Sequence, residues 1–372
     1  MKICFVIATR PEIIKCSPII RQCIKKKVNF FITHTGQHYT FNLDKIFFKE
    51  LKIPKPKYFL KVKSKHPTLE GDHTGRMLAK LDPVLIKEHP DYVIVQGDTN
   101  TTLAGALVTA KISTKKIFKN KIKLVHVESG LRSYDKMMPE ERNRVVADHL
   151  SDILFPPTKI SFNNLKKENL VNKNTLITGN TIVDSINENK KFLEKNKILN
   201  KLNLKKKNYF VVTMHRPETV DNLDRLLKLL NIIKKLTNIY SLPAIFPIHP
   251  RTKKNLKKIN LNRFKKIMII EPLSYINFLN LQKNAKLILT DSGGVQEEAC
   301  ILKVPCVTLR ENTERPETIN IGANIIAGYK EKKILYSVSK MIKKSRNWRQ
   351  PFGNGTASVK IIKYLISKNP KN

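Results

Sequence analysis

Residues 92–103 read YVIVQGDTNTTL, which is a strand pattern followed at once by a polar turn and the start of a helix. The apolar run from Tyr92 to Val95 does not alternate with polar residues, and this is typical of a strand buried on both faces of a parallel sheet. A carboxylate, Asp98, follows the strand. Either Asp98 caps the helix by accepting its free N–H groups, or it belongs to a site, because open parallel sheets bind ligands at the carboxyl ends of their strands.

Strand-like and helix-like segments alternate along the whole chain, which predicts an α/β fold with parallel sheets covered by helices. Expected strands of the first half are residues 3–7, 30–33, 92–95, 124–127 and 153–155, and those of the second half are 209–214, 244–248, 267–270, 287–290 and 306–309. We therefore expect two Rossmann-like domains facing a cleft, with boundaries at residues 1–179 and 180–355.

The composition is that of a folded protein, with 41% hydrophobic residues in a chain of 372. No apolar run approaches the roughly 20 residues that cross a bilayer, and the opening MKICFVIATRPE is too short in its apolar part for a secretory signal. The five cysteines are odd in number and contain no C-x-x-C pair, so we expect buried thiols rather than disulfides or a metal site. These features predict a cytoplasmic protein without a membrane partner.

A net charge of +40 makes nucleic acid the first partner to consider. The lysines are spread through nearly every segment, as in KKIFKNKIK and KLNLKKKN, and no zinc finger, RNP signature or aromatic-interleaved basic patch is present. We therefore expect no nucleic-acid role, and an anionic small substrate instead, because diffuse positive charge steers such a ligand as well.

The first strand ends in ATRPEIIKCSP, residues 8–18. Ser17 and Pro18 fit a helix N-cap and first helical position, which leaves residues 9–16 as a polar loop. Arg10 and Lys15 could then contact a phosphate, or they are idle surface cations. The turn has no G-x-G-x-x-G, so a nicotinamide cofactor is not indicated.

More acidic residues follow the next strand. Glu128, in HVESGLRS, has the same place after its strand as Asp98 has after the preceding one. In MPEERNR, Pro139 opens a helix, with Glu140 in its first turn and Arg144 one turn further on. Taken alone, this last group is better explained structurally, because acids favour a helix N-terminus and Glu140 with Arg144 can form an i,i+4 ion pair.

The second half repeats the arrangement. His215 ends a strand and stands beside Arg216, which favours a phosphate or acid role; His249 is a weaker candidate because the adjacent Pro250 is enough to shape its loop. In LILTDSGGVQEEAC, Gly293 and Gly294 would let the backbone approach a ligand, and the following helix start could hold a diphosphate. Glu297 or Glu298 could accept from ribose hydroxyls, or both are ordinary first-turn acids.

Taken together, the motifs resemble those of the non-hydrolysing UDP-N-acetylglucosamine 2-epimerases. The resemblance rests on TRPEIIKCSP, TGQHY, QGDTNTTLAGAL, HVESGLRS, MPEERNR, TGNTIVDSI, TMHRPET, TDSGGVQEEA and RENTERPETINIGAN, in this order. It implies a glycosyltransferase-B type fold, usually a homodimer, in which the second domain binds UDP and a C-terminal helix within residues 356–372 returns to the first domain.

The family reaction interconverts UDP-GlcNAc and UDP-ManNAc through bound UDP and 2-acetamidoglucal, with no metal and no cofactor. A base for the C2 proton and an acid for the opposite face then require several carboxylates around one sugar. The resemblance gives acid, base and leaving-group roles to Asp98, Glu128, Glu140 and His215. It gives diphosphate and ribose binding to Arg10, Lys15, Ser292, Gly293, Gly294, Glu298 and Arg315, and places Arg144 beside the catalytic set.

The sequence departs from the family pattern at two places. HRPET stands where many members have HRREN, so Pro217 and Thr219 change the loop after His215. GQHYT, residues 36–40, matches only Gln37 and His38 of the run that builds a second, activating substrate site in some bacterial members. Three alternatives are left open: a hydrolysing relative that releases ManNAc and UDP, an epimerase of a related UDP-sugar, and a glycosyltransferase with the same fold.

Overall fold

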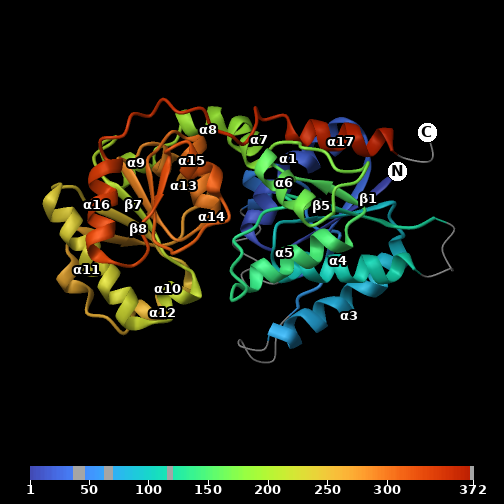
Figure 1. Ribbon diagram of the computed structural model, residues 1–372, viewed down its shortest axis with the longest axis horizontal. Helices are drawn as coiled ribbons and strands as arrows, with labels where there is room; N and C mark the ends of the chain where they lie inside the picture. Colours follow the sequence, from blue (N-terminus) through green and yellow to red (C-terminus); the bar gives the residue numbers. More distant parts are fainter. Residues whose placement is uncertain (37–46, 63–69, 115–119, 369–372) are drawn as a thin grey trace. The chain divides into compact units, whose positions relative to one another are not determined.

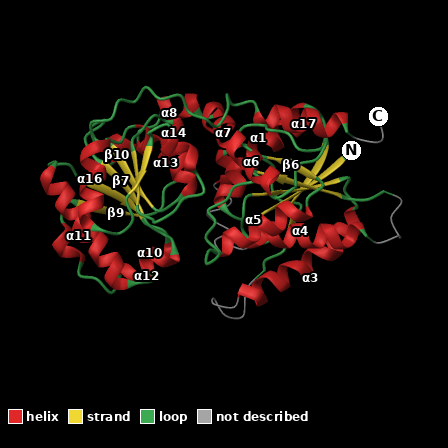
Figure 2. Ribbon diagram, in the orientation of Figure 1, coloured by secondary structure: helices red, strands yellow, loops and turns green. Residues whose placement is uncertain are grey.

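The chain folds into two compact units, here called unit 1 (residues 1–188 and 352–372) and unit 2 (residues 189–351). The structure is a computed structural model that describes residues 1–36, 47–62, 70–114 and 120–368. Each unit contains a six-stranded parallel sheet, and helices cover both faces of each sheet (Figures 1 and 2). The α/β class with two Rossmann-like units is confirmed, while the expected boundary at residue 179 falls inside unit 1, just before helix α7 (Thr181–Glu188).

The sheet of unit 1 has the strand order β3-β2-β1-β4-β5-β6. Its strands are β1 (Lys2–Ile7), β2 (Asn29–His34), β3 (Tyr58–Phe59), β4 (Tyr92–Gln96), β5 (Lys123–Val127) and β6 (Ile153–Phe155). All the expected strands form; β3 was not predicted because two residues give no readable pattern. Continuous burial along β4 explains why its apolar run does not alternate.

Two groups of helices cover this sheet. One face carries α3 (Glu70–Glu88), α4 (Asn100–Ser113) and α5 (Pro139–Leu150), and α4 packs against both α3 and α5. On the other face α1 (Arg10–Lys25) packs against α7 and against α17 (Ala357–Ser367), so the last helix of the described residues lies beside the first (Figure 1). The short α6 (Lys159–Lys167) follows β6.

Unit 2 repeats the same topology. Its sheet has the order β12-β11-β10-β7-β8-β9, which is the order of unit 1 read from the other edge. Its strands are β7 (Phe210–Thr213), β8 (Ala244–Pro247), β9 (Ile267–Ile270), β10 (Leu287–Thr290), β11 (Cys306–Thr308) and β12 (Asn324–Ile326). The five expected strands form, and β12 was missed because it is only three residues long.

Two apolar clusters fill the space on either side of this second sheet. The larger one joins α11 (Leu223–Ile239) and α16 (Glu331–Met341) to the strands. The other joins α9 (Ile198–Lys201), α13 (Tyr275–Lys283) and α14 (Gly293–Ile301) to the opposite face. Short elements complete the unit: α8 (Lys190–Glu194), α10 (Pro217–Val220), α12 (Pro250–Leu256), the 3₁₀ turn η1 (Leu261–Phe264) and α15 (Pro316–Asn320).

The predicted start of the first helix is wrong. Helix α1 begins at Arg10 with Thr9 as its N-cap, Pro11 occupies its first turn, and Pro18 lies inside it. The side chain of Glu12 accepts from the backbone N–H of Thr9 at 2.6 Å, which is one half of a capping box. The sequence signal for the start of α1 is therefore Thr9-x-x-Glu12, and the prediction from Ser17 and Pro18 placed the start too late.

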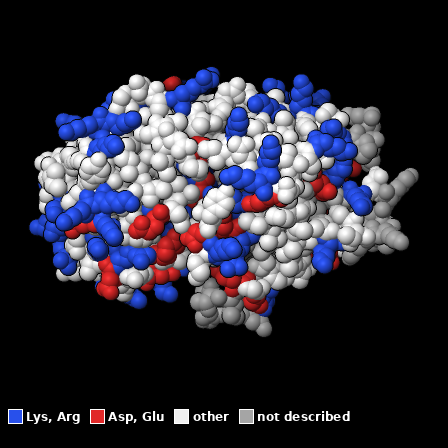
Figure 3. Space-filling model, in the orientation of Figure 1, with Lys and Arg blue, Asp and Glu red and all other residues white. Residues whose placement is uncertain are grey.

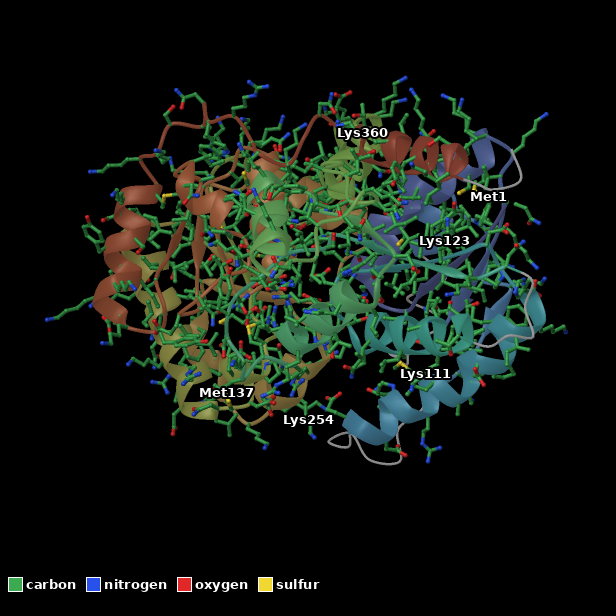
Figure 4. The ribbon with its side chains drawn as sticks, turned by 45° about the vertical axis from the view of Figure 1, so that its right-hand side comes forward. Met1, Lys111, Lys123, Met137, Lys254 and Lys360 are labelled. Carbon is green, nitrogen blue, oxygen red and sulfur yellow. The ribbon has the colours of Figure 1, made fainter. Side chains whose placement is uncertain are left out.

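Positive side chains come from many segments of the chain. Lysine and arginine alternate with other residues across the face shown in Figure 3. In unit 1, Lys111, Lys123 and Lys360 lie at separate places on α4, β5 and α17 (Figure 4). Among the described residues, no helix has both the length and the apolar content needed to cross a membrane.

Candidate active site

The two sheets bring the predicted site residues to equivalent places. In each sheet the strand order reverses between two neighbouring strands, β1 and β4 in unit 1 and β7 and β10 in unit 2. Ligands of doubly wound sheets bind at this switch point, outside the carboxyl ends of the strands. Arg10 and Asp98 follow β1 and β4, whereas His215 and Ser292 follow β7 and β10.

Asp98 is held by an arginine and does not cap a helix. The N-cap of α4 is Thr99, whose hydroxyl accepts from the backbone N–H of Thr102, so the capping interpretation of Asp98 is wrong. Arg144 of α5 donates through Nη2 to Asp98 Oδ2, and its guanidinium is almost fully buried. Asn143 donates to the backbone carbonyl of Asp98 at 3.0 Å. Side chain and main chain of Asp98 are therefore both fixed by α5.

Glu128 forms a second buried ion pair one strand further on. Lys15 Nζ lies 2.5 Å from Glu128 Oε2, and Gln96 Nε2 donates to the same oxygen at 2.7 Å. Glu128 has φ 71°, a left-handed conformation that costs a side-chain-bearing residue roughly 1–2 kcal/mol. Such local strain is concentrated at functional sites. Lys15, expected in a loop, reaches this position from the second turn of α1.

Helix α5 begins at Pro139, as predicted. Its intrahelical ion pair joins Arg144 Nη1 to Glu141 Oε2 at 2.5 Å, three residues apart. Glu141 also accepts from the backbone N–H groups of Ser133 and Tyr134, at 2.9 and 2.8 Å. Glu141 thus fixes the loop before the helix, while Glu140 stands half-buried in the first turn.

A further carboxylate, Glu12, joins the two turns of the unit 1 switch point. Its Oε2 accepts from the N–H groups of Ala8, at 3.0 Å, and Thr9, and its Oε1 accepts from the Thr99 hydroxyl at 2.6 Å. Burial raises the pKa of Glu12, and these hydrogen bonds oppose the shift. The neighbouring Arg10 lies with its guanidinium carbon 5.2 Å from the Phe47 ring centroid.

In unit 2 a buried aspartate fixes the turn that carries His215. Asp291 is fully buried, and its carboxylate accepts from the backbone N–H of His215 at 2.9 Å and of Arg216 at 2.9 Å. The His215 ring is about one-third exposed, with 36% of its side-chain surface accessible. Its centroid lies 5.5 Å from that of His249, which caps α12 ahead of Pro250, so the structural interpretation of His249 holds.

The two glycines at the start of α14 have different surroundings. A Cβ on Gly293 would overlap Glu314 Oε1, whereas a Cβ on Gly294 would meet no described atom within 4 Å. Gly293 therefore makes room for a buried carboxylate of the protein, and Gly294 leaves the helix start open. Ser292 is the N-cap residue, and its own N–H is bound by the Thr290 hydroxyl at 3.0 Å.

Both acids of α14 are buried and bonded. Gln282 Nε2 donates to Glu298 Oε2 at 2.6 Å, and Arg315 Nε donates to Glu297. Glu314 binds Arg310 at 3.0 Å and lies 3.5 Å from Arg216. Arg315 is consequently part of a buried ionic network.

Several residues of these networks were missed from sequence. Glu12 had a signal, the Thr-x-x-Glu capping box, and Asp291 stood in the quoted TDSGG stretch without a role. Gln96 and Asn143 gave no local signal, because their partners lie far away in sequence. Glu314 has one partner four residues away, Arg310, and a distant one, Arg216. In the part of the chain that the structure describes, no group of three or more histidine, cysteine or acidic side chains is arranged to hold a metal. Gln37 and His38 lie outside the described residues.

Comparison with known proteins decides the family. A family model described as UDP-N-acetylglucosamine 2-epimerase matches residues 22–366. The chain belongs to this family. The UDP-N-acetylglucosamine 2-epimerase of Methanocaldococcus jannaschii is 52% identical over 98% of this chain and 99% of its own, and that of Methanococcus maripaludis is 50% identical over 99% of each.

A solved structure of this epimerase family has the same fold. The crystal structure of Methanocaldococcus jannaschii UDP-GlcNAc 2-epimerase in complex with UDP-GlcNAc and UDP gives a TM-score of 0.92 at 52% identity, over 99% of this chain and 100% of the other. The resemblance drawn from the motifs is confirmed. As a member of the 2-epimerase family, the chain is an isomerase.

Proposed function

We propose that this epimerase converts UDP-GlcNAc reversibly into UDP-ManNAc by elimination and re-addition of UDP. The C2 proton leaves to a base while the C1–O bond to UDP breaks, which gives bound 2-acetamidoglucal and UDP. UDP then adds back to C1, and a proton is delivered to the other face of C2. Asp98, Glu128 and Glu140 supply the acid and base groups, and His215 assists the departing UDP.

The proposal is carried by two ion pairs, one at the end of β4 and one at the end of β5. Arg144 binds Asp98 and Lys15 binds Glu128, and in each pair the cation favours the carboxylate form. A general base must be ionised and held still. Two such carboxylates on adjacent strands suit a reaction that handles a proton on each face of one carbon.

Unit 2 supplies the proposed UDP site. The open helix start at Ser292 and Gly294 presents main-chain N–H groups, which bind a diphosphate well. Glu298 at the same helix can accept from ribose hydroxyls, and Gln282 holds its carboxylate in place. We assign Arg10, Lys15, Gly293, Arg144 and Arg315 to the substrate site as residues that contact UDP-sugar or fix those that do.

Two further predictions accompany this function. The family resemblance implies a homodimer, and five buried free thiols fit a reducing cytoplasm. A hydrolysing enzyme that releases ManNAc and UDP is the alternative reaction, together with epimerisation of a related UDP-sugar.

The deciding experiment is incubation with UDP-GlcNAc in heavy water, followed by proton and phosphorus NMR. Epimerisation predicts deuterium at C2 and intact UDP-ManNAc, because the abstracted proton exchanges before re-addition. Free ManNAc with UDP would show the hydrolysing reaction instead. Absence of any turnover, with turnover of an oxidised or 3-amino UDP-sugar, would move the assignment to a related substrate.

A further inference from the structure

A histidine that the reaction does not use lies beneath the two carboxylate-bearing turns of unit 1. His126 is on β5 and is completely buried. Its Nδ1 lies 2.7 Å from Asp148 Oδ1, and its Nε2 lies 2.8 Å from the carbonyl oxygen of Gly97. Gly97 is the residue directly before Asp98, so the ring touches the turn that positions this carboxylate.

The partners of the ring determine its protonation state. A main-chain carbonyl can only accept, so Nε2 must donate to Gly97. Arg132 Nη1 donates to Asp148 Oδ2 at 2.7 Å and the backbone N–H of Gly130 donates to the same oxygen at 3.0 Å. A guanidinium in direct contact favours the ionised form of a carboxyl group, so we take Asp148 as a carboxylate. Nδ1 must therefore donate too, and a ring that donates from both nitrogens is an imidazolium.

The same carboxylate connects both turns. Asp148 reaches Gly97 through His126 and reaches Gly130 directly, and these glycines flank Asp98 and Glu128 in sequence. Gly97 and Gly130 have φ of 74° and 77°, so each turn depends on a left-handed residue. Arg132 is in turn held by Glu168 at 2.7 and 2.5 Å. This hydrogen-bond network thus links three charged groups to the ring: Asp148, Arg132 and Glu168.

We propose that His126 is a positioning residue that donates from both ring nitrogens and, with Asp148, holds the turns of Asp98 and Glu128 in one geometry. This deepens the proposed function and rests on it, since it assumes that these carboxylates act on substrate. His126 itself touches neither the reacting atoms nor UDP-sugar; it acts through the Gly97 carbonyl. Charge-assisted hydrogen bonds suit this task because they are shorter and stronger than neutral ones.

The protonation state can be measured without activity. In protein labelled with ¹⁵N-histidine, both ring nitrogens of His126 should show attached protons. The signal is assigned by through-bond correlation in the wild type and by its loss in His126→Gln. In Asp148→Asn the amide nitrogen faces Nδ1, so the ring should lose its Nδ1 proton and keep the one on Nε2. A wild-type ring with either nitrogen unprotonated overturns the proposal.

The positioning role is tested by kinetics. His126→Gln and Asp148→Asn should each lower kcat by about 10- to 100-fold, since small misplacements of catalytic groups have effects of this order, with KM nearly unchanged. The matched control is Glu88→Gln, which neutralises a buried carboxylate bound by Lys2, Lys57 and Tyr58 in the same unit. It should lower stability and leave kcat unchanged.

The outcomes separate the two proposals. Folded variants that keep full kcat refute the positioning role, and an equal loss of kcat in Glu88→Gln shows that the effect is a general loss of structure. If neither His126→Gln nor Asp148→Asn folds, the wild-type NMR decides. If the wild type epimerises no UDP-GlcNAc but the ring is doubly protonated, the proposed function fails and the protonation state of His126 stands.

Discussion

The switch points of unit 1 and unit 2 share a topology but are built from different groups. Both sheets follow the same strand order, and in both a buried carboxylate binds main-chain N–H groups of the turn at the switch point. Glu12 does so for Ala8 and Thr9, and Asp291 does so for His215 and Arg216. Fixing this turn is therefore a requirement of the fold that each half meets separately.

The two switch points differ in the groups that they present to a ligand. At unit 1 the side chains form ion pairs, Asp98 with Arg144 and Lys15 with Glu128. At unit 2 the carboxylates are internal, and the surface of the helix start is left to Gly294 and main-chain N–H groups. Fixed charges suit proton transfer and open N–H groups suit a diphosphate. The difference agrees with the proposed function, which places the chemistry in unit 1 and UDP binding in unit 2.

Replacing Asp98 has the largest expected effect and tests whether the chemistry takes place at unit 1. Asp98→Asn keeps the shape but removes the carboxylate, so turnover and C2 deuterium exchange should fall by about 10²- to 10⁴-fold, the usual contribution of a general acid or base. UDP affinity, measured by calorimetry, should change little because that site is assigned to unit 2. Normal turnover in the folded variant would show that the role assigned to Asp98 is wrong.

Substitutions of the adjacent glycines Gly293 and Gly294 form a matched pair that tests UDP binding at unit 2. Gly293→Ala places a Cβ against Glu314, so we expect a loss of about 1–3 kcal/mol of unfolding free energy, as for other overpacked sites. Gly294→Ala meets open space and should keep stability, but weaken UDP binding by about tenfold, or roughly 1.4 kcal/mol. Thermal unfolding and UDP titration of both variants separate these effects. Unchanged UDP affinity in Gly294→Ala would remove this glycine from the site.

The architecture could be predicted because its signal is local. Uninterrupted apolar runs such as residues 92–95 and 287–290 indicate strands buried on both faces, and both segments form strands in which every residue is buried. The wrong helix start and the two missed strands also have local causes. Pro18 offered a false helix start, while β3 and β12 are too short to show a pattern.

Candidate site residues could be named from the sequence, but the hydrogen bonds that connect them could not be predicted. The position of Asp98 after a strand made it a candidate for a functional carboxylate, but no residue near it in sequence indicated Arg144 as its partner. The link between Asp148 and Gly97 through His126 likewise joins three separate segments. Hydrogen bonds of this kind depend on tertiary packing, which periodicity and spacing do not encode.

Acid should weaken unit 1 through two carboxylates that the fold keeps ionised. Hydrogen bonds from Lys2, Lys57 and Tyr58 lower the pKa of Glu88 from 4.5 to about 2, and His126 and Arg132 lower that of Asp148 against the effect of burial. A folded pKa below the unfolded value gives stability that is present above the unfolded pKa and is lost as pH falls through the folded one. In unit 2 the lowered pKa of Glu331 arises from its pair with Lys235, which is exposed and screened by water.

We therefore expect Glu88→Gln to be less stable than wild type at neutral pH, and the difference in urea midpoint to shrink as pH falls from about 4.5 towards 2. Urea unfolding at a series of pH values measures this. A midpoint difference that stays constant across this range would mean that Glu88 does not contribute through its charge.

The smallest effect concerns the cysteines, which can report on each unit separately. Cys4, Cys16 and Cys23 lie in unit 1 and Cys300 and Cys306 in unit 2, all buried. Burial raises the pKa of Cys4, Cys23 and Cys300 to about 12, and the thiolate is the reactive form. Alkylation of the native enzyme should therefore be negligible and leave activity unchanged.

In urea, peptide mapping of the alkylated thiols should show when each unit opens. Glu88→Gln should move labelling of Cys4, Cys16 and Cys23 to lower urea and leave Cys300 and Cys306 where they are in wild type, because Glu88 is bonded only within unit 1 in the part that the structure describes. Labelling of all five thiols at one shifted urea concentration would show instead that the two units unfold together. The difference in urea concentration at which the two sets of thiols become labelled thus measures how independently unit 1 and unit 2 unfold.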